Sequence, residues 1–255
     1  MRPLCATAPL LDGLRWGLCG AALPASGHVG REPTSTTVLK EALAVGWPGL
    51  CVLPPKEDGS KAPLVKWKER QSKRPAPEQM RRWYVEGGSS GVGVVCGRID
   101  RNLELFEFDD PTAYTLFKDA ATAVGLGDLI ERIEAGYLED TPGGSVHWLY
   151  RCEEIVINPT LARRPKLPDE MSDPEDKIKV LIETRGEGGY AILAPSGGRV
   201  YPTCKRYRLL NGGFDQIVTI TPQDRANLWA LVRRRGVTRV LLAIVRQPRQ
   251  PPPAC

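Results

Sequence analysis

Short apolar segments separated by polar turns run along most of the chain, and their spacing predicts the secondary structure. Strands are predicted where four to eight residues are rich in β-branched or aromatic side chains between Gly, Pro or Asp. Such runs occur at residues 49–53, 92–96, 103–108, 146–150, 178–182 and 190–193, with shorter ones at 137–138 and 207–210. The sequence therefore predicts a protein with substantial β-structure.

Helices are predicted mainly from their start signals. Asp110-Pro111 and Thr221-Pro222 each place a capping side chain before a proline at the first helical position. The expected helices cover residues 36–44, 77–86, 110–124, 128–135 and 221–235. Because these helices do not alternate regularly with the strands, the pattern favours an α+β fold over a parallel α/β fold.

The predicted elements lie in one region, residues 36–235, which we expect to be a single domain. Residues 1–35 are dominated by Gly, Ala, Pro and Ser without a period and are expected to be a flexible leader. Residues 236–255 form a Pro- and Arg-rich tail. Residues 152–177 are predicted to be a polar, Pro-rich insertion, basic at 163–166 and acidic at 169–176.

Composition limits the classes of protein and the cellular locations that fit the chain. The chain has no apolar run of 18 residues, so no membrane-spanning helix is expected. Its seven cysteines form no CxxC pair, which argues against a disulfide framework and a structural zinc site. A reducing cytoplasm is the expected location. The net charge of +5 is compatible with a polyanionic partner but does not require one.

Positive charge is concentrated in residues 56–82, which contain nine Lys or Arg and four Asp or Glu. Lys61 and Lys66 are predicted to contact the phosphates of a nucleic acid. Trp67 and Trp83 are interleaved with these charges, and an aromatic side chain such as Trp67 can stack on an unpaired base. A solvated basic loop is the alternative interpretation.

The predicted strand at 103–108 gives the first candidate for chemistry. Side chains alternate between the faces of a strand, so Glu107 and Asp109 would share one face while Phe106 and Phe108 fill the other. Two carboxylates on one face are a ligand pair for a divalent metal ion, which prefers hard oxygen donors. Taken alone, such a pair also fits a solvated strand end.

Two later strands carry further candidates. Ser145 and His147 would share a face after a Gly-Gly turn, where the histidine could donate to a phosphate oxygen of a nucleotide. Glu183 ends an apolar strand, where a carboxylate needs a metal or a cation as partner. Arg185 lies two residues on, on the same face, and could contact phosphate. A structural histidine and a plain hairpin turn at 186–189 are the alternatives.

In combination, these motifs are more specific than any of them alone. Acid-x-acid, Ser-x-His and hydrophobic-acid, each on a predicted strand and in this order, resemble the three-motif pattern of the archaeo-eukaryotic primase superfamily. The chain is similar to the bifunctional primase/polymerase amino-terminal domain of phage and plasmid replication proteins over about residues 39–235. The similarity extends to Lys-Ala-Pro-Leu-Val-Lys-Trp at 61–67, the glycine-rich segment 91–97, Thr-Pro-Gly-Gly at 141–144, and residues 188–196.

The resemblance implies an RRM-like primase/polymerase catalytic core with a mixed, mainly antiparallel sheet and flanking helices. In such a core Glu107, Asp109 and Glu183 would hold two divalent ions, Mg²⁺ or Mn²⁺. His147, with Ser145, would contact the incoming triphosphate. One residue departs from the family pattern, because the first acid is usually aspartate. The extra methylene of Glu107 moves its carboxylate by about a bond length, which puts the preferred metal in question.

The implied activity is that of a DNA primase and template-directed DNA polymerase. Its partners would be a single-stranded DNA template, nucleoside triphosphates and a replicative helicase supplied in trans, since the chain contains no GxxxxGK[ST] loop. Two other functions use the same residues. A phosphodiesterase or nuclease would use the same acids on water to cleave a phosphodiester. A catalytically idle module would only bind single-stranded DNA.

Overall fold

Strand β3 (Leu103–Phe108) lies in the middle of the larger of two sheets, between β5 (Val146–Cys152) and β7 (Ile178–Arg185). The computed structural model describes residues 50–171 and 173–233. The expected leader, the expected helix at 36–44 and the expected tail lie outside the described residues.

The larger sheet has seven strands and is antiparallel except at one pair. Its order is β6-β7-β3-β5-β4-β9, and β10 pairs with β5 in parallel. The remaining strands of this sheet are β4 (Tyr137–Asp140), β6 (Thr160–Pro165), β9 (Arg208–Gly212) and β10 (Thr219–Ile220). A smaller antiparallel sheet has the order β1-β2-β8 and consists of β1 (Val52–Leu53), β2 (Val92–Val95) and β8 (Tyr190–Leu193).

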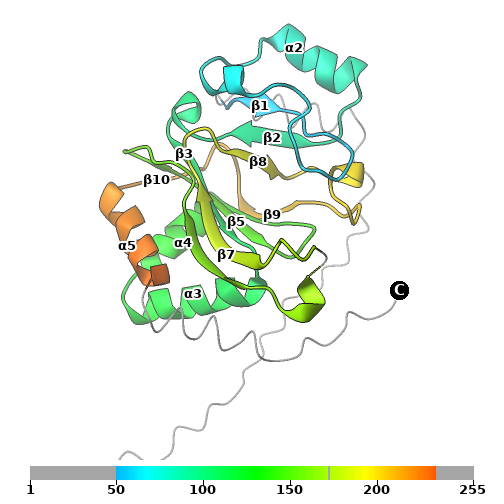
Figure 1. Ribbon diagram of the computed structural model, residues 1–255. Helices are drawn as coiled ribbons and strands as arrows, with labels where there is room; N and C mark the ends of the chain where they lie inside the picture. The colour runs from blue at the N-terminus through cyan, green and yellow to red at the C-terminus, as the bar shows by residue number, and fades with distance from the viewer. Residues whose placement is uncertain (1–49, 172, 234–255) are drawn as a thin grey trace, which may run out of the picture. The chain divides into compact units, whose positions relative to one another are not determined.

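Four α-helices complete the described part of the chain: α2 (Pro77–Arg81), α3 (Pro111–Ala123), α4 (Gly127–Gly136) and α5 (Pro222–Arg233). Helices α3, α4 and α5 pack on one face of the larger sheet (Figure 1). The α+β architecture with a mixed, mainly antiparallel sheet and flanking helices is therefore confirmed. No helix in the described ranges combines the length and apolar character that a membrane span requires.

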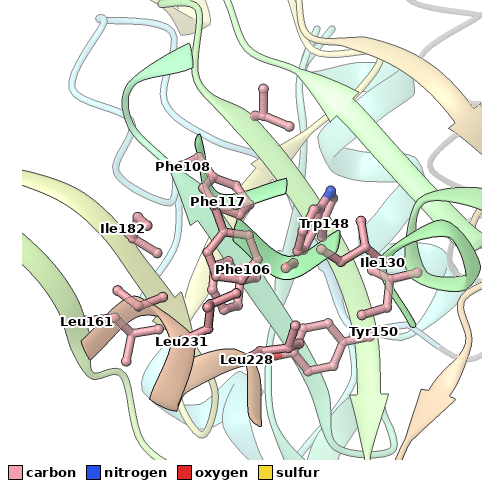
Figure 2. Packing of buried hydrophobic residues seen from close by; sticks show 14 of the residues in the cluster. Phe106, Phe108, Phe117, Ile130, Trp148, Tyr150, Leu161, Ile182, Leu228 and Leu231 are labelled. Carbon is pink, nitrogen blue, oxygen red and sulfur yellow. The ribbon is translucent and has the colours of Figure 1, made fainter. Parts of the chain in front are cut away.

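The alternation of β3 divides the interior into two hydrophobic clusters. Phe106 and Phe108 pack with Phe117 and Trp148 beneath the helices (Figure 2). Leu105, on the opposite face, packs in the cluster that includes the strands of the smaller sheet. A slip of one residue would expose both phenylalanines, each of which contributes about 2 kcal/mol by burial. This packing therefore fixes the face on which the acids of β3 stand.

The helix starts agree with their predicted chemistry. The Asp110 side chain accepts a hydrogen bond from the Thr112 N–H at 2.8 Å, as expected for a cap of α3. The Thr221 hydroxyl accepts one from the Asp224 N–H at 3.0 Å at the start of α5. The helix expected at 77–86 is an α-helix only to Arg81 and continues as a π-helical turn, Arg82–Glu86.

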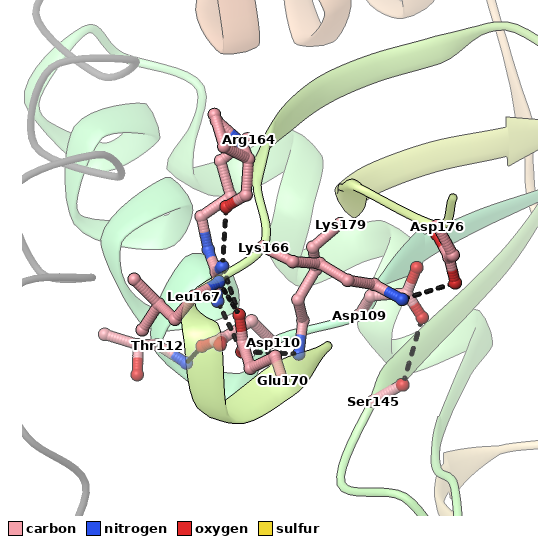
Figure 3. Close-up of polar contacts among 11 residues, drawn as sticks. Asp109, Asp110, Thr112, Ser145, Arg164, Lys166, Leu167, Glu170, Asp176 and Lys179 are labelled. Carbon is pink, nitrogen blue, oxygen red and sulfur yellow. Dashed lines mark hydrogen bonds and ion pairs between the residues drawn. The ribbon is translucent and has the colours of Figure 1, made fainter. Parts of the chain in front are cut away.

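The polar insertion at 152–177 contains a strand that was not predicted, β6, and a 3₁₀ turn (Pro168–Glu170). The basic half pairs with the acidic half: Arg164 Nη2 lies 2.7 Å from Glu170 Oε1, and Lys166 forms an ion pair with Asp176 (Figure 3). Strand β6 is an edge strand that ends in proline and buries few apolar side chains, so it lacks the usual hydrophobic signal.

Helix α5 is joined to the sheet by a buried ion pair. Arg225 Nη1 lies 2.7 Å from Glu104 Oε1, and the same nitrogen donates to the Glu154 carbonyl at 2.6 Å. Both side chains are shielded from solvent. Burial raises the pKa of Glu104, and the Arg225 charge opposes that rise.

Arg225→Met is expected to lower the free energy of unfolding by about 3–5 kcal/mol, because the Glu104 carboxylate would stay buried without its partner. The loss should be smaller at pH 5 than at pH 8, since the unpaired buried carboxyl takes up a proton as the pH falls. Urea unfolding at both pH values measures the effect. The control is Arg132→Met, which removes the exposed pair with Asp224 and should cost under about 1 kcal/mol. Equal losses in the two variants would contradict the prediction.

Candidate active site

Four adjacent strands of the larger sheet carry one ionisable side chain each in a single row. Glu139 in β4 is paired with His147 in β5, His147 with Glu107 in β3, and Glu107 with Glu183 in β7. Directly opposed residues of neighbouring antiparallel strands project to the same face. The row therefore stands on the face opposite Phe106 and Phe108, away from the helices.

Three acids converge at one end of this row. Carboxylate oxygens of Glu107, Asp109 and Glu183 lie within 4.8 Å of one another. Asp109 follows the last residue of β3, and its N–H donates to the Leu181 carbonyl at 2.9 Å, which continues the pairing with β7. The structure thus brings together the three acids that the sequence analysis grouped. Three clustered carboxylates are a donor set that fits a divalent cation.

The charges in this cluster are unequal. Burial raises the pKa of Asp109 to about 7, and the nearby charges of Glu107 and Glu183 add to the rise. Burial would also raise the pKa of Glu107, but the positive charges of His147 and Arg185 outweigh it and hold this pKa at about 2. Near neutral pH Glu107 is therefore ionised, while Asp109 exchanges a proton that a bound cation would displace. Burial also raises the pKa of the third acid, Glu183.

His147 is almost fully buried and lies between two carboxylates. Its Nδ1 is 2.7 Å from Glu139 Oε1, and its Nε2 is 3.3 Å from Glu107 Oε1. Burial alone would lower the pKa of His147, but Glu107 and Glu139 outweigh it and raise this pKa to about 10. Sequence reasoning missed Glu139, because only residues 137–138 were recognised as a strand. The acid at the next position was the available signal.

Ser145 and Arg185 were predicted to contact a nucleotide. In this structure both of them contact the acids. The Ser145 hydroxyl donates to Asp109 Oδ1 at 3.3 Å (Figure 3). Arg185 forms an ion pair with Glu183, and its Nη2 lies 3.6 Å from Glu107 Oε2. Ser145 and Arg185 thus belong to the polar surroundings of the acidic cluster.

Two tyrosine rings, Tyr201 and Tyr207, lie one after the other in space between Lys61 and His147. Its Nζ lies 4.5 Å from the centre of the Tyr201 ring, Tyr201 is 6.2 Å from Tyr207 between ring centres, and Tyr207 is 6.1 Å from the His147 ring. The Tyr201 hydroxyl packs against Gly143, where a Cβ atom would stand only 2.3 Å away. No motif in the sequence marks the two tyrosines as part of the site.

The other residues of the basic segment differ in their surroundings. Lys66 is exposed, and Trp67 is half-buried against the cluster around the smaller sheet. Trp83 is buried, 7 % exposed, within that cluster. Trp83 is therefore a core side chain and not an aromatic platform for bases, as its position among charged residues had suggested.

Comparison with known proteins places these motifs in a family. The family model of the bifunctional DNA primase/polymerase, N-terminal, matches residues 39–227, which include the whole row and the acidic cluster. No curated protein matched the chain in a separate search. The matched region covers more than half of the chain. The chain therefore belongs to the bifunctional DNA primase/polymerase N-terminal domain family, a family of primase/polymerase-type nucleotidyltransferases.

Proposed function

We propose that the chain is a DNA primase and DNA polymerase that joins NTPs or dNTPs on a single-stranded DNA template, in replication of the phage or plasmid type. One observation carries the proposal: Glu107, Asp109 and Glu183 converge beside the buried His147 in a chain of this family. Residues 36–235 would be the catalytic domain. A replicative helicase acting in trans would supply the template.

The acids would hold two ions, Mg²⁺ or Mn²⁺. When bound, such ions supply activation of a 3′-hydroxyl and neutralisation of the pyrophosphate leaving group. Ser145 would orient the Asp109 carboxylate through the hydrogen bond it already donates. The side chain of Arg185 is 36 % exposed and has five N–H donors, so it can remain paired with Glu183 and still contact a phosphate. His147 would add a positive charge beside the triphosphate.

The template would enter along the basic segment. Lys61 and Lys66 are exposed, which supports a role in binding the phosphates of single-stranded DNA. The tyrosines between Lys61 and His147 connect this segment to the acids. Trp67 would contribute its exposed edge to a base.

Asp109→Asn and Glu183→Gln are each expected to reduce nucleotide incorporation at least about a hundredfold, because each removes a negative ligand that positions charge in the transition state. Extension of primed and unprimed single-stranded templates with labelled triphosphates measures the loss. Asp119→Asn, an exposed acid of α3, is the matched control and should retain activity.

Two outcomes of this assay would contradict the proposal. Cleavage of the template without triphosphates, abolished by Asp109→Asn, would indicate the nuclease instead. Salt-sensitive DNA binding without incorporation, unchanged in both acid variants, would indicate the idle binding module.

Affinity for Mn²⁺ is expected to rise about tenfold between pH 6 and pH 8, because Asp109, with a pKa of about 7, must lose its proton before it can bind the ion. Glu107, with a pKa of about 2, is ionised throughout this range and adds no dependence. Calorimetric titration at both pH values measures the change. An equal affinity at pH 6 and pH 8 would be evidence against Asp109 as a ligand.

Glu107→Asp is expected to raise the rate with Mg²⁺ relative to the rate with Mn²⁺. Mg²⁺ demands near-ideal octahedral geometry, and the shorter side chain restores the aspartate that is usual in the family. The ratio of the two rates in primer extension measures the effect. A lower Mg²⁺-to-Mn²⁺ ratio in the variant would show that the extra methylene does not disfavour Mg²⁺.

A further inference from the structure

Glu139 is a fully buried carboxylate, 0 % exposed, at the end of the row farthest from the acidic cluster. Its Oε2 accepts two hydrogen bonds of 2.7 Å, from the Tyr137 hydroxyl and from the Ala194 N–H. Its Oε1 faces His147 Nδ1 at 2.7 Å. Within the described ranges, His147 is its one ion-pair partner. A buried carboxylate is costly unless it is paired, so this pairing accounts for its presence.

The hydrogen bonds of Glu139 have a fixed direction. An ionised carboxylate only accepts, so Nδ1 of His147 must carry the proton of their shared hydrogen bond. The backbone N–H of Ala194 can only donate, so it holds Glu139 Oε2 in place while Oε1 faces the ring. The edge of the His147 ring that faces β4 is therefore held by Glu139.

The other edge of the ring is held less well. His147 Nε2 is shielded from solvent and lies 3.3 Å from Glu107 Oε1, close enough for an ion pair but without the geometry of a hydrogen bond. A buried donor without a hydrogen bond is rare in native structures and is a common sign of a ligand site. An oxygen of a bound triphosphate would supply that partner.

We propose that Glu139 is a positioning residue for nucleotide binding: it holds Nδ1–H of His147 and so presents Nε2–H beside the acids to a triphosphate oxygen. This inference rests on the proposed nucleotidyl transfer. Glu139 itself touches neither the acidic cluster nor the nucleotide. It acts through the orientation and hydrogen-bond polarity of the His147 ring.

Glu139→Gln tests this role because its amide has one possible orientation. The Ala194 N–H requires the amide oxygen on its side, so the amide NH₂ must face His147 Nδ1 and turn that nitrogen into an acceptor. The bond that holds the ring is then reversed: Nδ1 accepts from a neutral amide where it donated to a carboxylate, so the ring is held less firmly. Hydrogen bonds with an ionised partner are roughly twice as strong as neutral ones.

Steady-state extension should show a KM for the triphosphate about tenfold higher in Glu139→Gln, with kcat changed less than about threefold. Glu134→Gln is the matched control: this buried glutamate of α4 also accepts from a tyrosine hydroxyl, that of Tyr114, but lies beneath the sheet. Its KM should equal that of the unchanged protein.

A double-mutant cycle separates positioning from a general loss of stability. In a His147→Asn background, Glu139→Gln should raise KM less than about twofold, because the residue through which it acts is gone. Full tenfold effects in both backgrounds would overturn the proposal, and so would equal KM values for Glu139→Gln and Glu134→Gln.

Nitrogen NMR gives a readout that does not depend on activity. The chain has only two histidines, so ¹⁵N labelling of histidine yields a simple spectrum. His147 Nδ1 should appear protonated in the unchanged protein and as an acceptor in Glu139→Gln. An unprotonated Nδ1 in the unchanged protein overturns the proposal even if the variant does not fold. Failure to extend any template would reject the proposed function instead, while the NMR result would still report on the pair.

Discussion

The register of β3 against its two neighbours is the constraint on which the candidate active site depends. Glu107 lies opposite His147 on one side and opposite Glu183 on the other. A shift of one residue in either pairing would send the side chains to the opposite face. Phe106 and Phe108 prevent that shift, because their rings are buried under α3 and α4. The hydrophobic packing of one face thus sets the chemistry of the other.

The same register places like charges together at a cost in stability. Three carboxylates within 4.8 Å repel one another, and this repulsion adds to burial in raising the pKa of Asp109. Arg185 and His147 offset part of the repulsion in the absence of an ion. A cation bound to the acids would take over that role, so that Arg185 and the fixed ring of His147 could donate to a triphosphate instead. The acids could thus exchange their present partners, Arg185 and His147, for a bound cation.

Most of the central sheet could be predicted from the sequence, because its strands carry strong local signals. The alternation around Phe106 and Phe108 gave both the strand and the shared face of Glu107 and Asp109 correctly. Edge strand β6 escaped prediction, since only two of its six residues are buried. The burial of Trp83 could not be predicted either, because it depends on tertiary contacts with the smaller sheet and the surrounding segment is rich in Lys and Arg.

The convergence of the acids with His147 was predictable only from the order of the motifs. Glu183 lies 76 positions after Glu107 but is paired with it on the neighbouring strand. No local pattern predicts this pairing, because strand order is set by packing of the whole sheet. The role of Glu139 could not be predicted for the same reason, although an acid directly after the predicted strand at 137–138 was visible. Its significance lies in Tyr137, His147 and the Ala194 N–H, which come from different parts of the chain.

Ala194 connects the row of ionisable side chains to the smaller sheet. It follows β8, and two residues later the Ser196 hydroxyl bonds both the N–H and the carbonyl of Val92 at the start of β2. The backbone that holds Glu139 is therefore itself held by the smaller sheet. Residues 188–196, which lie within the region that the family model matches, gain a physical role from this connection. They fix the donor that directs Glu139, and through Glu139 the ring of His147.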